Sequence, residues 1–127
     1  MKITVTLPGS IRSKKNSKRI YGMGKFKKVL PSKAYLAWEE KARLMVLSYL
    51  SQTTNFDMTG WKHVNVSVNA QIFFKGPQPD LSGCLESIGD AMEGFLWAND
   101  KQIYSWDGSR LHHDKENPRT EITVEYK

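Results

Sequence analysis

The chain has 127 residues, a formal net charge of +6 and an isoelectric point of about 9.5. This length supports one domain with a modest core and is too short for two, so we expect a single domain over residues 1–127. The single cysteine, Cys84, excludes an internal disulfide and a multi-cysteine zinc site.

The excess of cations is compatible with a polyanionic partner, although many soluble proteins share it. The first residues alternate between apolar and polar and do not resemble a signal peptide. No apolar run approaches the roughly 20 residues of a membrane span. We therefore expect a soluble, cytoplasmic protein without a membrane partner.

The first predicted strand, Lys2–Leu7, is followed by a basic segment, residues 10–30, and the first acidic residue of the chain is Glu39. A hairpin can pair Lys18–Tyr21 with Lys25–Val29 through a glycine-containing turn. Cations that contact phosphates release counterions, so this acid-free segment indicates DNA binding; the alternative is a merely solvated face. The candidate DNA-binding residues are Lys14, Lys15, Asn16, Lys18, Arg19, Lys25, Lys27 and Lys28, with Lys101 further along the chain.

The longest predicted helix covers residues 33–50, with Ser32 as its N-cap after Pro31. Its aromatic residues, among them Tyr35, Trp38 and Tyr49, are expected to contact the core or a second copy of the chain rather than to stack on bases.

Three more strands are predicted at residues 64–74, 102–106 and 120–126. A second helix lies between the first two of them, with a candidate cap at Ser82 and a candidate end at Gly94. The expected fold is therefore a single α/β domain with one mixed four-stranded sheet and two main helices. The order is strand, basic loop, helix, strand, helix, strand, strand.

Four acidic residues accompany this strand–helix–strand unit. Asp80 follows the strand 64–74, Glu86 and Asp90 lie four residues apart on the helix, and Asp100 precedes the next strand. We expect the unit to bring the two strand ends together and to form a carboxylate site for Mg²⁺, which prefers oxygen ligands. The alternative is an ordinary solvated helix face.

A set of short motifs extends over most of the chain. They are Leu-Pro-Gly at 7–9, Lys-Lys-Asn-Ser at 14–17, Pro-Ser-Lys-Ala-Tyr at 31–35, Asp-Leu-Ser-Gly at 80–83, Asp-Ala-Met-Glu-Gly at 90–94 and Trp-Ala-Asn-Asp-Lys-Gln-Ile at 97–103. Together they resemble the RusA-type Holliday-junction resolvases, small homodimeric Mg²⁺-dependent endonucleases that cut four-way DNA junctions. The combined pattern is specific, whereas no single motif is.

The chain departs from the family pattern at four polar positions, one of which is Gly83, where the family has an asparagine. The family's second aspartate falls on Ser82, its helix lysine on Glu86 and the first of its paired aspartates on Asn99. Asp80 and Asp100 keep the family's acids by position, and Glu86 can restore the missing carboxylate from one turn along the helix.

The resemblance implies a homodimeric, metal-dependent endodeoxyribonuclease that resolves four-way (Holliday) junctions in recombination and repair. Asp80, Asp100 and Glu86 would be catalytic and, with Asp90, would hold Mg²⁺, or Mn²⁺ as its substitute. Two other interpretations remain open: a non-catalytic junction-binding or DNA-binding protein on the same fold, and a protein-interaction module whose acids are only surface.

Overall fold

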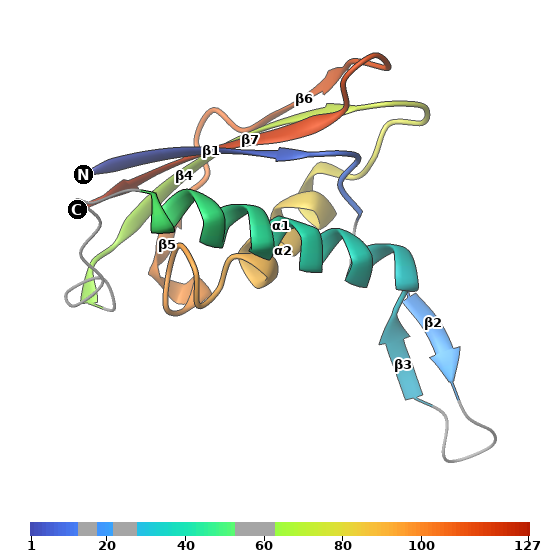
Figure 1. Cartoon of the computed structure of the whole chain (residues 1–127), viewed down its shortest axis with the longest axis horizontal. Helices are drawn as coiled ribbons and strands as arrows, with labels where there is room; N and C mark the ends of the chain where they lie inside the picture. The colour runs from blue at the N-terminus through green and yellow to red at the C-terminus, as the bar shows by residue number, and fades with distance from the viewer. Residues whose placement is uncertain (13–17, 22–27, 53–62) are drawn as a thin grey trace.

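The computed structural model of the chain describes residues 1–12, 18–21, 28–52 and 63–127, with the backbone alone described at 18–21 and 28–31. Both described helices lie on one side of a mixed five-stranded sheet (Figure 1). The elements are β1 (Lys2–Pro8), β2 (Lys18–Tyr21), β3 (Lys28–Pro31), α1 (Lys33–Ser51), β4 (Val66–Phe74), α2 (Leu81–Ala91), η3 (Asp100–Gln102), β5 (Ile103–Ser105), β6 (Arg110–His113) and β7 (Arg119–Tyr126).

The sheet has β7 between β1 and β4, antiparallel to both. The other edge of β4 pairs in parallel with two short strands placed end to end. β5 lies beside Val66 and Ser67, whereas β6 lies beside the segment from Gln71 to Phe74. The predicted α/β fold with a mixed sheet is confirmed.

The predicted count of four strands omitted β6, which lies in a segment where no strand was expected. Its sequence, Arg-Leu-His-His, contains a single apolar residue, so no alternation indicates a strand. Its pairing with β4 depends instead on contacts far apart in the chain.

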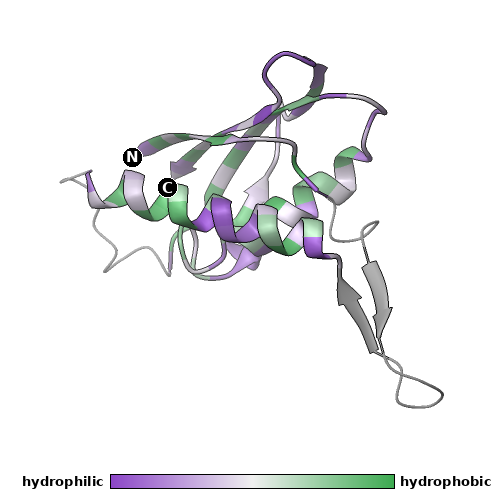
Figure 2. Ribbon diagram, turned by 45° about the vertical axis from the view of Figure 1, so that its right-hand side comes forward, coloured by the Kyte–Doolittle hydropathy of each residue, from purple (hydrophilic) through white to green (hydrophobic). Residues whose placement is uncertain are grey.

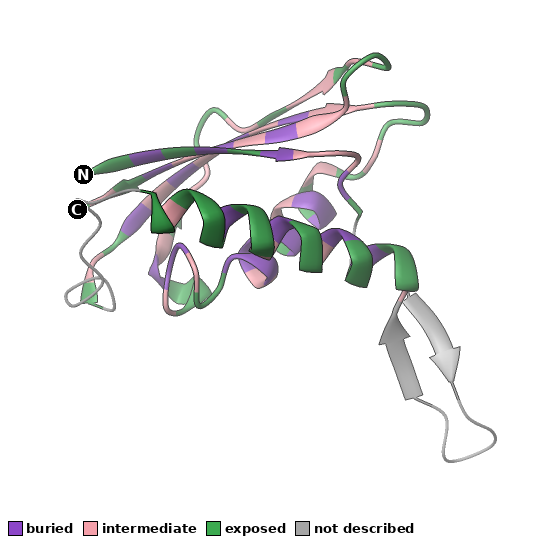
Figure 3. Ribbon diagram, viewed as in Figure 1, coloured by how far each residue is buried: buried purple, intermediate pink, exposed green. Residues whose placement is uncertain are grey.

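The core lies between the sheet and the helices. Alternate residues of each long strand face the helices, and in β4 the fully buried ones are Val66, Val68, Ala70 and Ile72. From α1, the buried side chains recur at helical spacing and are Tyr35, Trp38, Ala42 and Val46. Figure 3 shows this buried stripe on the side of α1 that faces the sheet.

The predicted extent and cap of α1 are confirmed: the helix begins at Lys33, and the Tyr35 backbone N–H donates to Ser32 Oγ at 3.1 Å. The opposite side of α1 is exposed and is not wholly polar (Figure 2). Its large exposed apolar residues are Leu36, Leu44, Met45, Leu47 and Tyr49. From the amino end of α1, the β2–β3 hairpin extends away from the sheet (Figure 1).

The predicted start of α2 at Ser82 was wrong by two residues. Asp80 occupies the N-cap position in extended conformation, and Ser82 already lies within the helix. Its hydroxyl donates to the Asp80 carboxylate at 3.1 Å instead of capping the backbone. The helix ends at Ala91, and Gly94 adopts a positive φ of 88° in the turn that follows.

Neither helix in the described part of the chain has the length and apolar character that crossing a bilayer requires.

Candidate metal centre at the carboxyl end of α2

The parallel pairing of β4 with β5 decides which acids meet. Ile103, the first residue of β5, is in register with Val66, the first residue of β4. Asp100, just before β5, therefore lies near the start of β4. Because α2 runs back from the far end of β4, its carboxyl end also returns to this place, with Asp90 on its last turn.

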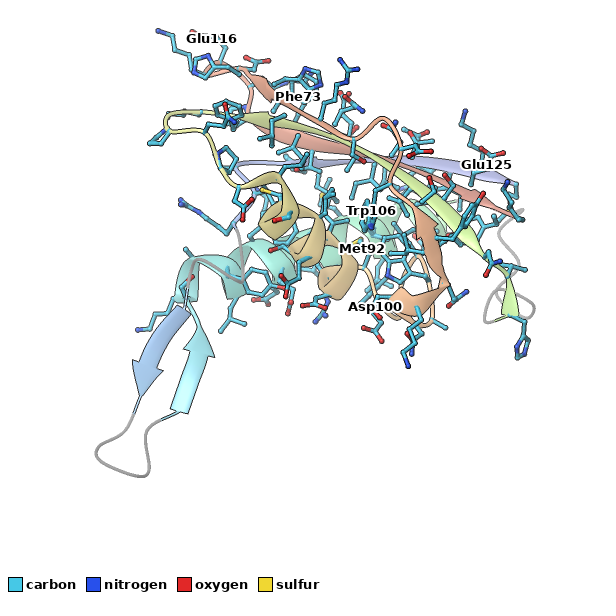
Figure 4. The ribbon with its side chains drawn as sticks, turned by 180° about the vertical axis from the view of Figure 1, so that it is seen from behind. Phe73, Met92, Asp100, Trp106, Glu116 and Glu125 are labelled. Atoms are coloured by element: carbon cyan, nitrogen blue, oxygen red, sulfur yellow. The ribbon has the colours of Figure 1, made fainter. Side chains whose placement is uncertain are left out.

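Three acidic side chains converge here. Asp90, Glu93 and Asp100 each place a carboxylate oxygen within 4.8 Å of those of the other two. We call these three residues the acidic cluster. Asp90 is half-buried, whereas Glu93 and Asp100 are exposed. Figure 4 shows Asp100 on the opposite side of the molecule from Phe73 and Glu116.

Two residues of the acidic cluster, Asp90 and Asp100, border an open hollow of about 310 Å³ between α2 and the start of β5. Ser82, Glu86 and Asp90 recur every four residues and form a stripe along its α2 wall. Asp100 and Trp106 contribute to the opposite wall. The hollow thus carries polar groups along its length and its negative charge mainly at one end.

Asp100 is positioned by a capped turn that is tied to the sheet. The Asn99 side chain accepts a hydrogen bond from the Lys101 backbone N–H at 2.9 Å. The Gln102 side-chain oxygen accepts from the backbone N–H groups of Ala98 and Asn99, at 2.8 and 2.9 Å. Gln102 Nε2 donates to the Val64 carbonyl oxygen at 2.8 Å, which fixes the turn beside β4. The three-residue turn that carries Asp100 is therefore held at both ends.

The electrostatics of a helix does not favour acidic side chains at the position of the acidic cluster. Like charges repel at these separations, and the carboxyl end of a helix carries the negative end of its macrodipole. Acidic side chains normally stabilise the amino end instead. Three carboxylates gathered at the carboxyl end of α2 therefore form a place where a divalent cation is attracted.

Asp80 lies apart from this cluster. It is at the amino end of α2, ten residues before Asp90, which corresponds to roughly 15 Å along a helix axis. Its carboxylate accepts the Ser82 hydroxyl and borders a second hollow, of about 570 Å³, together with Arg12 and Lys75. A β-α-β unit with parallel strands puts the end of one strand and the start of the next at opposite ends of its helix, so the structure does not bring Asp80 and Asp100 together as we expected.

The other predicted residues divide into three groups. Asp90 and Asp100 meet in the acidic cluster, and Glu86 lines the same hollow. Lys101 is exposed beside Asp100. Of the predicted DNA-binding residues, the backbone alone is described for Lys18, Arg19 and Lys28, and the remaining five lie outside the described residues: Lys14, Lys15, Asn16, Lys25 and Lys27.

Glu93 was not among the ligands predicted from the sequence. It follows the end of α2, in a turn closed by a hydrogen bond from the Gly94 N–H to the Trp97 carbonyl oxygen. Its spacing of three residues from Asp90 was the available signal, because residues three apart lie on the same side of a helical turn.

Comparison with known proteins is consistent with this geometry. The family model described as endodeoxyribonuclease RusA matches residues 8–125. A search of curated proteins returned no match. The family match covers nearly the whole chain, including α2 and the residues of the acidic cluster. The chain therefore belongs to the RusA endodeoxyribonuclease family.

Proposed function

We propose that this protein is a divalent-metal-dependent endodeoxyribonuclease that resolves four-way DNA junctions in recombination and repair, acting in the cytoplasm. Family membership implies the endodeoxyribonuclease activity. The observation that carries the metal dependence is the convergence of Asp90, Glu93 and Asp100 within 4.8 Å in a chain of this family.

The chemistry of the acidic cluster fits Mg²⁺. All three candidate ligands are carboxylate oxygens, and Mg²⁺ is bound through few carboxylates while it keeps several waters. Glu93 and Asp100 are exposed, so water and a phosphate oxygen have access. Mn²⁺ prefers the same ligands and is the natural substitute. When bound, the ion supplies charge stabilisation for the phosphoryl oxygens and lowers the pKa of a bound water.

The residues of the chain have separate roles in this proposal. Asp90, Glu93 and Asp100 hold the cation, and Glu86 orients water or phosphate further along the hollow. Lys101, exposed beside Asp100, offsets negative charge on the scissile phosphate. Asp80 is retained as a catalytic acid on the family resemblance, although its position at the other end of α2 leaves it outside the acidic cluster.

The basic segment holds the DNA. This binding is electrostatic and does not depend on the DNA sequence. Neutralising Lys14, Lys15, Lys18 and Arg19 together should weaken binding to any DNA and reduce its salt dependence. The expected change in the slope of log K against log salt is about 0.9 for each lost contact with duplex phosphates. A slope equal to that of the wild-type protein would remove the segment from the interface.

The protein is proposed to act as a homodimer. A four-way junction has near two-fold symmetry, and paired cuts need two active sites related by a two-fold axis. The exposed apolar residues Leu44, Leu47 and Tyr49 on α1 offer part of an interface. Sedimentation at micromolar concentration should give a dimer; a species near 14.6 kDa that stays monomeric on junction DNA would contradict the paired-cut mechanism.

One experiment tests the function as a whole. The purified protein is incubated with a labelled four-way junction and with a duplex of matched sequence, each with and without Mg²⁺. We expect paired cuts in the junction, with Mg²⁺ only, and little cleavage of the duplex. Cleavage that continues in EDTA would contradict metal dependence, and equal cleavage of both substrates would contradict the preference for junctions.

A non-catalytic DNA-binding protein on the same fold is the second candidate. Ser82, Glu86 and Asn99 stand where the family pattern has an aspartate, a lysine and another aspartate. Asn99 serves as the cap of the turn that carries Asp100. Junction binding that persists in EDTA, with no cleavage in either Mg²⁺ or Mn²⁺, would favour this second function.

A further inference from the structure

A row of polar side chains on α1 faces the carboxyl end of α2. Tyr35, Glu39 and Arg43 follow one another at four-residue spacing, so they lie along one side of the helix. The Tyr35 hydroxyl donates to Glu39 Oε2 at 2.6 Å, and Glu39 Oε1 pairs with Arg43 Nη1 at 3.1 Å. The row therefore ends on a guanidinium whose direction is constrained.

Arg43 extends across to α2. Its Nε–H donates to the Ala91 carbonyl oxygen at 2.9 Å, and Nη2 donates to the Asp90 carbonyl oxygen at 3.4 Å. Its guanidinium carbon also lies 5.4 Å from the centre of the Phe95 ring. One side chain thus contacts the last turn of α2 and the loop that follows it.

These contacts complete the hydrogen bonding of the helix end. The last four carbonyls of a helix have no partner within the regular helical pattern. Here the Met92 N–H makes the last regular bond, to Ile88. Of the four carbonyls beyond it, that of Met92 accepts from the N–H groups of Phe95 and Leu96, at 3.0 and 2.9 Å, and that of Gly89 accepts from the Trp97 indole at 3.1 Å. The remaining two carbonyls, those of Asp90 and Ala91, accept from Arg43. Arg43 therefore supports the backbone of a residue of the acidic cluster.

Burial increases along this row from Arg43, whose side chain is 36% exposed, to Tyr35. Tyr35 is fully buried, and the Glu39 side chain is 16% exposed. Burial, together with the hydrogen bond to the Glu39 carboxylate, raises the pKa of Tyr35 above its usual range, so its hydroxyl keeps the proton that it donates. A side-chain donor held in this way has little freedom to reorient.

We propose that Arg43 is a positioning residue for the metal centre: it fixes the carboxyl end of α2 so that Asp90 and Glu93 face Asp100. This inference rests on the proposed metal-dependent function and names a residue of that same site which does not touch the ion. Groups that only support a ligand typically change metal affinity or activity by about 10–100-fold. An ion pair within one helix is by contrast worth little to stability.

The test measures Mn²⁺ affinity by calorimetry on the full chain without DNA, beside junction binding and the cleavage rate. Arg43→Gln should weaken Mn²⁺ affinity at least tenfold and lower the cleavage rate, with junction affinity unchanged. Arg43→Lys should recover part of the loss, because an ammonium can reach a carbonyl but cannot donate in the same fork. Lys41→Gln is the control, since it removes one cation from an exposed position of the same helix.

The outcomes separate the role of Arg43 from the proposed function. Wild-type Mn²⁺ affinity in Arg43→Gln, or an equal loss in Lys41→Gln, would overturn the role of Arg43 alone. Absence of Mn²⁺ binding by the wild-type chain would overturn the metal centre and the role of Arg43 with it. If Arg43→Gln fails to fold, Glu39→Gln takes its place: it weakens the hold on Arg43, and wild-type affinity in that variant would overturn the proposal.

Discussion

The two ends of α2 carry acidic residues in opposite electrostatic settings. At the amino end, Asp80 occupies the cap position, where the macrodipole favours a negative charge, and it accepts the Ser82 hydroxyl. At the carboxyl end, Asp90, Glu93 and Asp100 gather where the macrodipole disfavours them. Helix electrostatics therefore accounts for an acid at the position of Asp80 but does not account for the acidic cluster.

The ends also differ in how firmly they are held. The amino end borders the larger hollow, and the hydrogen bond from Ser82 to the Asp80 carboxylate is exposed there. The carboxyl end is fixed by the Trp97 indole and by Arg43, and the turn that carries Asp100 is tied to Val64 by the Gln102 side chain. Rigid support around a group of ligands is what a precise metal site requires.

Asp100→Asn should have the largest effect. It removes a charged ligand without adding bulk, so we expect both Mn²⁺ affinity and junction cleavage to fall by at least about a hundredfold, beyond the 10–100-fold typical of a supporting group. Junction affinity should be retained. Calorimetry with Mn²⁺ and a single-turnover cleavage assay measure the two losses, and a variant that cleaves at the wild-type rate would remove Asp100 from the site.

Asp80→Asn separates the two ends most clearly. The family resemblance predicts that cleavage is lost, whereas the position of Asp80 outside the acidic cluster predicts that Mn²⁺ affinity in the absence of DNA is kept. The expected result is therefore loss of junction cleavage with wild-type Mn²⁺ affinity. Loss of Mn²⁺ binding together with cleavage would instead mean that Asp80 and Asp100 share one ion.

Glu86→Ala tests the middle of the hollow. Glu86 lies one turn from Asp90 on the same stripe and provides the carboxylate that we expect to replace the family's missing aspartate. We expect about a tenfold loss of cleavage rate with a smaller loss of Mn²⁺ affinity, because Glu86 is not part of the acidic cluster. Wild-type rates in this variant would show that the compensation does not occur.

Trp97→Phe and Ser82→Ala should have the smallest effects of all these variants, and these effects are on stability. The first substitution leaves the buried Gly89 carbonyl without its indole donor, which corresponds to about 1–3 kcal/mol of unfolding free energy. Ser82→Ala, at the other end of α2, should cost no more than about 0.5 kcal/mol because its bond is exposed. The two losses of unfolding free energy are compared from the midpoints of urea denaturation at an unchanged slope. Equal losses in the two variants would contradict the conclusion that the carboxyl end of α2 is held more firmly than the amino end.

Much of this arrangement could be predicted from local sequence patterns. The extent of α1, its Ser32 cap and the two longest strands of the second half follow from apolar periodicity and cap chemistry. Asp100 before a strand and Asp90 on the helix could be identified as candidate ligands in the same way. These features depend on residues close together in the chain.

The remaining features depend on residues far apart in the chain. Glu93 lies beyond the end of α2 in a turn closed by Trp97, and its three-residue spacing from Asp90 does not by itself show that this turn faces Asp100. The separation of Asp80 from Asp100 follows from the parallel register of β4 and β5, which the two strand sequences do not specify. Arg43 is an ordinary exposed-face residue in the helical pattern, and only the packing of α1 against α2 reveals its bonds to Asp90 and Ala91.

The central claim is that the acidic cluster at the carboxyl end of α2 holds a divalent cation. Its most direct test is a Mn²⁺ titration followed by electron paramagnetic resonance, on the wild-type chain and on a variant combining Asp90→Asn, Glu93→Gln and Asp100→Asn. We expect saturable binding by the wild-type chain and none by the triple variant, with circular dichroism showing that both are folded. Equal Mn²⁺ binding by the two folded proteins would contradict it.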